Sequence, residues 1–335
     1  MHLLLGMVWG NTISAAVTAT AKLKIADHIT DVPRPCEEIA EAAGTDPAAT
    51  RRLLRALVSL SLLTENKQDC FALTEAGALL RDDAPDSYGQ AAAVFGDEGL
   101  WQGSRGMTHS VRTGAPAFDA FMGTGLFGYL ERHPEDHARF NAAMGQASRT
   151  LVPALLAHVD FGSATEVVDV GGGDGTLVAA VLGRHPHLRG TVFDTAQGAT
   201  EAERTLRAAG VADRASVRHG DFFEEVPATG DLYLLKNILH DWDDAHCARI
   251  VARCRAAMRP GNRLMIIAPV LPDRATAGAA TASYLNDLTM LVNLGGRERT
   301  RAEYRSLLSD GGFTVTGFQE LPGAAGFFAV HATAV

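Results

Sequence analysis

The segment from Val167 to Thr176, VVDVGGGDGT, has the composition of a loop that binds a small molecule through its backbone. Glycines at 171, 172, 173 and 175 would let a ligand approach the main chain at the end of an apolar strand. The dinucleotide fingerprint G-x-G-x-x-G would require a glycine where Thr176 stands. Asp169 and Asp174 add negative charge, which disfavours a pyrophosphate and suits a ligand with a cationic amino-acid end.

Two later predicted strands also end in acidic residues. Asp194 comes about twenty residues after the glycines, where a carboxylate can accept both hydroxyls of a ribose. Asp221 and Phe222 end the next strand, where an adenine would meet a carboxylate and an aromatic face. Because the carboxyl ends of parallel strands share one edge of a sheet, these residues together indicate an adenosine pocket without a phosphate site.

His240 follows directly on the apolar strand DLYLLKN, and it is the candidate proton acceptor. A free phenol has a pKa about 3.5 units above that of a free imidazole, so complete proton transfer in the ground state is unfavourable. Transfer is expected as the hydroxyl attacks, or where a nearby positive charge stabilises the phenolate. A carboxylate on the far ring nitrogen would fix the tautomer and raise the basicity of the ring.

Two acidic residues in the C-terminal part are candidates for supporting roles. Asp287 lies in a helix predicted over about 276–294, at the edge of its apolar stripe. Glu298 stands just before a capping box formed by Thr300 and Glu303, and the cap does not require it. Both carboxylates are therefore free for a partner elsewhere in the fold.

The elements that must position these residues form an α/β pattern in the second half of the chain. Apolar, β-branched strands are predicted at 165–170, 189–194, 215–220, 231–237, 263–270, 313–320 and 327–333, mostly with helices between them. This order predicts a doubly wound, mostly parallel seven-stranded sheet. Only LPGAAG separates the last two strands, so a hairpin should place one antiparallel strand in the sheet.

Residues 1–150 are predicted to be mainly helical and to form a separate domain, with a catalytic domain over 151–335. Within the first, a helix should end at Gly44, and Thr45 or Asp46 should cap the next helix. The extended piece CFALTEAG follows, so the segment has the order of a winged helix-turn-helix. Such a module either binds DNA or packs against another chain, and the acidic composition favours packing.

Taken together, the motifs VVDVGGGDGT, FDTAQ, GDFF, LLKNILHDWDD and GGRERT resemble those of the class I S-adenosylmethionine-dependent O-methyltransferases. The similarity is to the subgroup that acts on phenolic and other small natural products, and it covers nearly the whole chain. It implies a Rossmann-like methyltransferase sheet, an N-terminal winged-helix dimerisation domain and a homodimer. It also implies methyl transfer that releases S-adenosyl-L-homocysteine. From the residues themselves, in-line attack of the acceptor oxygen on the methyl carbon is expected, without a metal.

The resemblance also implies roles for individual residues. It places the methionine end of S-adenosyl-L-methionine at Gly171 and Gly173, the ribose at Asp194 and the adenine at Asp221 and Phe222, with Lys236 at the edge of the cofactor site. It makes His240 the general base, with Asp287 and Glu298 as helper acids. The acceptor pocket is expected from the helical region, where Met144 in FNAAM matches the family best and Trp101 and Phe140 are further candidates. Met107, Phe121 and Phe127 are candidates from the same region.

Two departures from the family pattern stand beside this agreement. FDTAQ replaces the commoner F-D-L-P, and Ala268 and Pro269 end the fifth strand where an acidic residue is usual. Two alternative functions, which do not depend on these departures, are also considered for the fold and the winged-helix segment. One is a methyltransferase fold that uses the bound cofactor for hydroxylation, decarboxylation or cyclisation. The other is a DNA-binding regulator.

Composition limits the choice of partners and compartment. The formal net charge is −9, which argues against broad binding to nucleic acid or to an anionic membrane. The chain start lacks a basic segment, and the four dispersed cysteines favour reduced thiols, so a cytoplasmic protein is expected. Asp241, Asp243 and Asp244 are interpreted as caps and dipole partners of the following helix and not as magnesium ligands.

Overall fold

The computed structural model describes residues 2–30, 32–324 and 326–335. The backbone divides into two compact units. The first unit runs to Trp101 and includes Ala138–Thr150, and the second comprises Gln102–His137 and Leu151–Val335.

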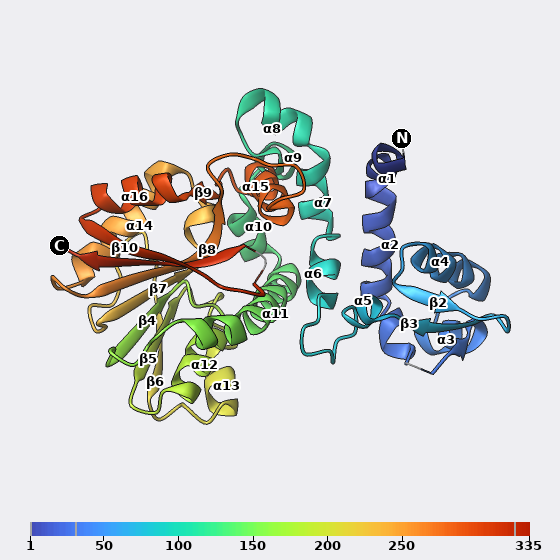
Figure 1. Ribbon diagram of the computed structural model, residues 1–335, viewed down its shortest axis with the longest axis horizontal. Coiled ribbons are helices and arrows are strands. Elements are labelled where there is room, and N and C mark those ends of the chain that lie inside the picture. The colour runs from blue at the N-terminus through green and yellow to red at the C-terminus, as the bar shows by residue number, and fades with distance from the viewer. Residues whose placement is uncertain (1, 31, 325) are drawn as a thin grey trace. The chain divides into compact units, whose positions relative to one another are not determined.

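The first unit is mainly helical (Figure 1). Its elements are α1 (His2–Val8), α2 (Gly10–Lys22), η1 (Ile25–His28), β1 (Arg34–Pro35), α3 (Cys36–Ala43), α4 (Pro47–Ser59), β2 (Leu63–Glu65), β3 (Cys70–Leu73), α5 (Glu75–Ala78), α6 (Gly89–Val94) and the start of α7 (Glu98–Arg105). The three strands form a small antiparallel sheet in the order β1-β3-β2.

The winged-helix segment follows the predicted local signals. Gly44 ends α3 with a φ of 65°, a left-handed conformation that glycine adopts without strain. Asp46 caps α4 by accepting the backbone N–H of Ala49 at 2.8 Å, and Pro47 fills the first helical turn. Thr74 then caps α5 after the β2–β3 hairpin, so the order helix, helix, wing is confirmed.

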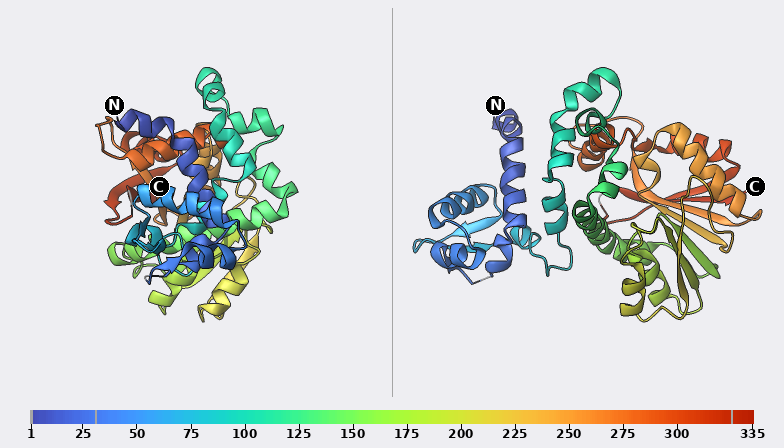
Figure 2. Two further views of the ribbon diagram at one scale, coloured as in Figure 1. Left: turned by 90° about the vertical axis from the view of Figure 1, so that its right-hand side faces the viewer. Right: turned by 180° about the vertical axis from the view of Figure 1, so that it is seen from behind.

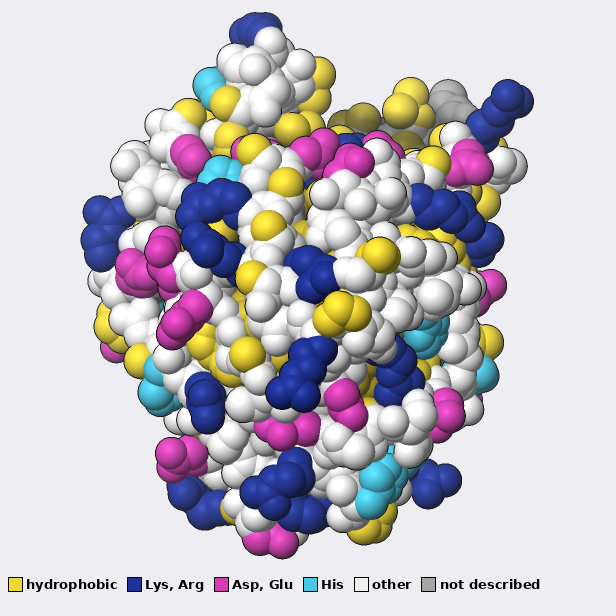
Figure 3. Space-filling model, turned by 90° about the vertical axis from the view of Figure 1, so that its left-hand side faces the viewer, with side chains coloured by type: hydrophobic (Ala, Val, Ile, Leu, Met, Phe, Trp, Pro, Cys, Tyr) yellow, Lys and Arg dark blue, Asp and Glu magenta, His cyan; other side chains and the backbone are white. Residues whose placement is uncertain are grey.

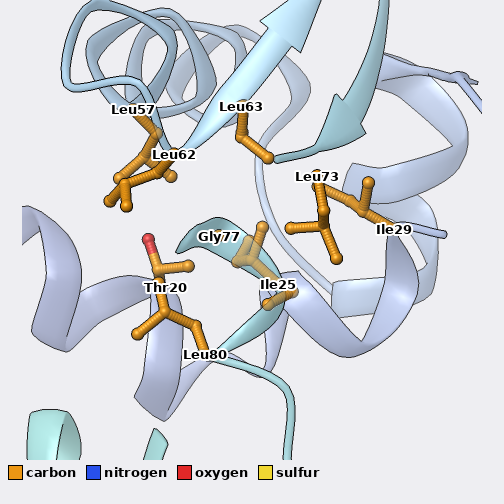
Figure 4. A pocket seen from close by; sticks show the side chains of 10 residues that line it. Thr20, Ile25, Ile29, Leu57, Leu62, Leu63, Leu73, Gly77 and Leu80 are labelled. Atoms are coloured by element: carbon orange, nitrogen blue, oxygen red, sulfur yellow. The ribbon is translucent and has the colours of Figure 1, made fainter. Parts of the chain in front are cut away.

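A small cavity in the first unit is lined almost entirely by aliphatic side chains (Figure 4). Leu57, Leu63 and Ile25 from different elements line it, and no charged side chain does. Gly77 permits this packing, because a Cβ there would lie 1.9 Å from the Leu62 carbonyl oxygen. The cavity is part of the core of this unit and has no group suited to catalysis.

The second unit is built on a twisted sheet, visible at the left of Figure 1 and from behind in Figure 2. Its strands are β4 (Glu166–Val170), β5 (Arg189–Asp194), β6 (Ala215–His219), β7 (Leu232–Lys236), β8 (Arg263–Leu271), β10 (Phe313–Glu320) and β11 (Phe327–Ala334), in the spatial order β10-β11-β8-β7-β4-β5-β6. Strand β11 is antiparallel to both β8 and β10, as the predicted hairpin requires. A two-residue strand, β9 (Arg299–Thr300), is an addition to the prediction and pairs with the end of β8.

Helices cover both faces of this sheet (Figure 2). The helices of this unit are α8 (Met107–Thr113), α9 (Ala117–Met122), α10 (Leu126–Arg132), the two ends of α11 (Pro134–His158), α12 (Thr176–Arg184), α13 (Ala202–Ala208), α14 (Asp244–Ala257), α15 (Thr281–Asn293) and α16 (Arg301–Asp310), with the short turn η2 (Leu239–Asp241) after β7. Successive strand residues alternate between two core clusters, one with α12 and α13 and the other with α14 and α16. Cys247 and Cys254 pack in the second cluster, as expected.

Two boundaries differ from the sequence-based expectation. Helix α15 begins at Thr281 and not near 276, because Gly278 and Ala280 have positive φ angles of 79° and 52°. Residues 102–137 were expected in the first domain, but the structure groups them with the second unit. Helices α8 and α9 pack against α15, which explains that grouping.

Candidate active site

The glycine loop after β4 lies against the ends of the neighbouring strands. Gly171 and Gly173 have positive φ angles of 72° and 55°. A Cβ on Gly171 would lie 2.3 Å from Ile238 Cδ1, so the loop passes close to the segment after β7. The backbone N–H of Gly173 donates to Asp194 Oδ2 at 2.8 Å, which joins the loop to the end of β5. The backbone of the loop is thus held at the carboxyl edge of the sheet, where ligands bind in this class of fold.

Asp169 is a buried carboxylate whose oxygens lack hydrogen-bond donors in the described part of the chain. It is 1% exposed, and neither carboxylate oxygen has a hydrogen-bond partner among the residues that the structure describes. Burial raises the pKa of Asp169 to about 7, against the opposing charge of Lys236. Burial likewise lowers the pKa of Lys236. An ammonium group bound at this edge would satisfy the orphaned oxygens, so the site fits the amino-acid end of S-adenosylmethionine.

Asp194, Asp221 and Phe222, which are predicted to contact the ribose and the adenine, lie at the end of β5 and just after β6. Asp194 is the last residue of β5, and Thr195 donates its backbone N–H to Oδ1 at 2.7 Å. Burial raises the pKa of Asp194, and the hydrogen bonds from Gly173 and Thr195 oppose that effect. Asp221 is exposed and turns the chain by accepting the N–H of Phe223 at 2.8 Å. Cε1 of Phe222 lies 3.7 Å from the Cβ position of Gly171, which places the ring beside the glycine loop.

His240 lies in the turn η2, buried at 7% exposure. Its Nδ1 forms a 2.8 Å hydrogen bond with Oε1 of Glu298, which is 2% exposed. Asn286 donates its side-chain amide to the same Oε1 at 2.6 Å. Because a carboxylate can only accept, Nδ1 carries the proton in the neutral ring, and the lone pair of Nε2 is left for a substrate.

Asp241 was predicted to cap the following helix, but in the structure its carboxylate lies beside the His240 ring. Its Oδ1 lies 3.4 Å from His240 Nε2, on the opposite side of the ring from Glu298. Burial raises the pKa of Asp241 to about 6, although the charge of His240 opposes the change. Only Asp243 caps α14 through its side chain, and Asp244 pairs with Arg297 and Arg299 in the first turn.

Asp287 contacts the site through Glu298 and not through the imidazole ring. Its Oδ1 accepts the backbone N–H of Glu298 at 2.8 Å, and no hydrogen bond joins it to His240 among the described residues. Burial raises the pKa of Asp287. Asn286, its neighbour on α15, contacts the Glu298 carboxylate directly. The sequence had no signal for Asn286, because its partner lies twelve residues away, beyond the end of the helix.

The expected acceptor-pocket residues divide between the two units. Trp101, Phe140 and Met144 are half-buried in the first unit. Phe127, considered in the sequence analysis, belongs to the second unit and stacks on Trp242 with a centroid distance of 5.4 Å and an interplanar angle of 22°. Because Trp242 is two residues after His240, Phe127 is the aromatic candidate that the structure brings to the turn carrying the histidine.

Residues 2–30, 32–324 and 326–335 contain neither a candidate metal centre nor a candidate membrane-spanning helix. No group of three or more His, Cys, Asp or Glu side chains there is arranged to hold a metal ion. In the same ranges, every helix is too short or too polar to cross a lipid bilayer.

Comparison with known proteins identifies the family. Residues 105–314 match the model of an O-methyltransferase domain, and residues 5–83 match that of an O-methyltransferase dimerisation domain. The O-demethylpuromycin-O-methyltransferase of Streptomyces alboniger is 45% identical over 99% of this chain and 89% of its own length. The chain therefore belongs to the S-adenosylmethionine-dependent O-methyltransferases, and the predicted fold, cofactor and enzyme class are confirmed.

Two further relatives show the range of chemistry around this fold. An O-methyltransferase from neocarzinostatin biosynthesis has been solved with S-adenosylmethionine and 2-hydroxy-5-methyl naphthoic acid; it superimposes with a TM-score of 0.80 at 34% identity, covering 96% of each chain. The phenazine-1-carboxylate N-methyltransferase of Pseudomonas aeruginosa is 32% identical over 95% of this chain and 93% of its own length.

Proposed function

We propose that this enzyme methylates a phenolic hydroxyl of a small aromatic natural product and that His240 is its general base. The observation that carries the proposal is the buried hydrogen bond between His240 Nδ1 and Glu298 at 2.8 Å. It leaves Nε2 as the proton-accepting atom at the carboxyl edge of the sheet, beside the loop that fits the cofactor.

We further propose that Gly171, Gly173 and Asp169 hold the amino-acid end of the cofactor, with Lys236 beside them. Asp194 would hold the ribose, and Asp221 with Phe222 the adenine. When bound, S-adenosylmethionine supplies an electrophilic methyl group and departs as S-adenosylhomocysteine. The role of these residues is to fix that group in line with the attacking oxygen, since orientation supplies much of the acceleration in such a transfer.

His240 takes the hydroxyl proton on Nε2 in this proposal. Burial by itself would lower the pKa of His240, but the carboxylates of Asp241 and Glu298 outweigh it and raise that pKa above 6.5. A more basic imidazole narrows the gap to a phenol and makes transfer during attack more favourable. Asp241, 3.4 Å from Nε2, stabilises the imidazolium that results.

The acceptor pocket is proposed to include Trp101, Phe140 and Met144, which are half-buried residues of the first unit. The domain matched over residues 5–83 supports a homodimer. We also propose a cytoplasmic location, on the evidence of the reduced, dispersed cysteines. We propose oxygen as the nucleophile because the O-methyltransferase model matches this chain, although a relative at 32% identity methylates nitrogen.

A DNA-binding function is not favoured by the winged-helix segment. Arg51 of α4 pairs with Glu37 and Asp69, and Arg55 pairs with Glu65 and Asp69. These acidic partners neutralise guanidinium groups that would otherwise meet phosphates. Figure 3 shows a face of the second unit, over α14, α16 and β10, and there too basic and acidic side chains are interspersed and form no broad positive surface.

The test uses His240→Ala and His240→Asn with a panel of hydroxylated aromatics, among them O-demethylpuromycin and 2-hydroxy-5-methyl naphthoic acid. We expect kcat to fall by about 10²–10⁴-fold while the Kd for S-adenosylmethionine, measured by calorimetry, is little changed. Near wild-type turnover in either variant would disprove the general-base role. S-adenosylhomocysteine released in a ratio other than one per methylated product would favour the non-methylating alternative.

A further inference from the structure

The turn that carries His240 has two backbone carbonyls that the turn itself does not satisfy. Asp241 donates its N–H to the Ile238 carbonyl, which closes η2. The carbonyls of Leu239 and Trp242, on either side of the His240–Asp241 pair, instead accept from side chains. The geometry of the turn therefore depends on what supplies those donors.

Arg299 supplies them. Its Nη1 donates to the Leu239 carbonyl at 2.6 Å, and its Nη2 donates to the Trp242 carbonyl at 3.1 Å. The guanidinium thus bridges both ends of the turn with one rigid, planar group. The Cys247 thiol approaches the same two carbonyls at 3.0 and 3.4 Å, and it lies 3.2 Å from Nη2.

The burial of Arg299 is compensated at Nη1 and Nη2, whereas its buried Nε has no hydrogen-bond partner among the described residues. The residue is 1% exposed, and Nη2 also binds Asp244 Oδ1 at 2.8 Å. A buried guanidinium without such partners would be strongly destabilising, so each contact contributes to a single arrangement. A lysine has one donor centre and cannot reproduce the fork that bridges two carbonyls and a carboxylate.

Arg299 also follows Glu298 directly in the chain. The segment that contains both residues pairs with β8 through β9. From this segment, Glu298 binds the imidazole Nδ1 of His240, and Arg299 binds the carbonyl of Leu239, the residue before the histidine. Because Glu298 and Arg299 are adjacent in the chain, the imidazole ring of His240 and the backbone of its turn are fixed relative to each other.

We propose that Arg299 is a positioning residue of the reaction: it holds the 239–242 turn so that Glu298 meets Nδ1 and Nε2 faces the acceptor. This inference rests on the proposed role of His240. A displacement of reacting groups by about 1 Å costs on the order of 10²-fold in rate, so loss of the bridge should lower kcat strongly.

The experiment compares Arg299→Met and Arg299→Lys with the wild-type enzyme. Histidine-labelled protein and two-bond proton–nitrogen NMR, with the His240 signal assigned from His240→Asn, report the tautomer and pKa of the ring without any acceptor. We expect Arg299→Met to lose the Nδ1–H tautomer preference and to shift the His240 pKa toward the free value of about 6.5. With an acceptor from the panel, kcat should fall by about 10²-fold, the KM for S-adenosylmethionine should stay unchanged, and the lysine variant should recover part of the rate.

Leu308→Ala is the matched control, because Leu308 is fully buried in the core cluster that contains Leu239 and Cys247, and its aliphatic side chain cannot donate a hydrogen bond to the carbonyls of the turn. At a similar loss of Tm, it should keep the His240 spectrum and kcat of the wild type. An unchanged spectrum in folded Arg299→Met, or equal losses in Leu308→Ala, would overturn the inference.

Asp244→Asn and Asp243→Asn decide the question if the arginine variants do not fold. Asp244 has 62% of its side chain exposed and binds Arg299, whereas Asp243 caps α14 and Asn retains that cap. Only Asp244→Asn should alter the His240 spectrum and lower kcat; identical behaviour of the two variants contradicts the proposal. Should His240→Asn itself keep turnover, the proposed function fails while the spectra still decide whether Arg299 orients the ring.

Discussion

His240 stands between two carboxylates that act on different nitrogens. Glu298 holds Nδ1 at 2.8 Å, and Asp241 lies 3.4 Å from Nε2. In the proposed mechanism, Glu298 fixes the tautomer, whereas Asp241 acts on the nitrogen that takes the proton. The two acids are therefore expected to have separable effects on the pH dependence of the reaction.

Asp241→Asn should shift the acid limb of the pH profile to lower pH. His240 is an effective base only when neutral, and Asp241 is a cause of its raised pKa. Removing that charge lowers the pKa, so a larger fraction of the ring is neutral in acid solution. The measurement is kcat from pH 5 to 9, with Glu298→Gln for comparison. An acid limb at its wild-type position would contradict this role of Asp241.

The buried carboxylate of Asp169 is expected to lower the stability of the cofactor-free fold and to favour binding of S-adenosylmethionine. Burial raises its pKa to about 7 in the folded protein, whereas the unfolded value is about 3.9. The folded state therefore binds more protons between these values, and the group makes stability fall as pH rises from about 4 to 7.

Asp169→Asn should accordingly stabilise the cofactor-free enzyme above pH 7, by up to about 4 kcal/mol, and do little near pH 4. The variant should also bind S-adenosylmethionine more weakly, because it lacks the carboxylate that is proposed to pair with the ammonium group of the cofactor. Thermal unfolding across this pH range, with and without the cofactor, measures both effects. A variant that is less stable at pH 8, or that binds the cofactor as tightly as the wild type, would show that the carboxylate is compensated in another way.

At the scale of elements, the backbone of the loop before β9 packs directly against the backbone of the turn η2. A Cβ on Gly296 would lie 2.0 Å from the His240 carbonyl oxygen and 2.6 Å from the Trp242 nitrogen. The two segments are 56 positions apart in the chain, yet their backbones are in direct contact. Glycine at this position is required by the close approach and not by its φ angle.

Gly296→Ala should displace the turn and lower kcat by about 10²-fold, with folding retained. Gly183→Ala is the control, because a Cβ there meets nothing within 4 Å and alanine favours the α12 helix. Steady-state kinetics and circular dichroism of both variants give the comparison. Equal rates for Gly296→Ala and the wild type would mean that the loop moves away without affecting the histidine.

At the scale of the whole molecule, the N-terminal segment exposes apolar side chains of the kind that are buried in protein–protein interfaces. Leu4, Met7, Val8 and Trp9 are 68%, 65%, 67% and 58% exposed, a cluster of large apolar side chains on and just after α1. Most of them fall within residues 5–83, which match the dimerisation domain. Exposed clusters of this kind usually mark a surface that another chain covers.

The double variant Val8→Lys, Trp9→Lys should therefore shift the protein from dimer to monomer, since two charges would have to be buried in the interface. Light scattering after size-exclusion chromatography measures the mass, and the exposed Arg204→Lys serves as a neutral substitution of the surface. A double variant that remains dimeric at low micromolar concentration would place the interface elsewhere.

The sequence by itself determined the parts of this protein that depend on local pattern. The strands, the closing hairpin, the Asp46 cap and the Thr300–Glu303 capping box all appear where periodicity and capping residues indicated them. The acidic ends of β4 and β5 followed from the same reasoning, because parallel strands bring their carboxyl ends to one edge.

Only the tertiary structure decided how the polar and charged groups are arranged around His240. Asp241 was interpreted as part of a helix cap, Asn286 had no signal, and Arg299 could not be paired with a turn sixty positions earlier. Residues 102–137 join the second unit for a similar reason, through contacts with α15. Such contacts depend on how distant segments pack together, and neither helical nor strand periodicity carries that information.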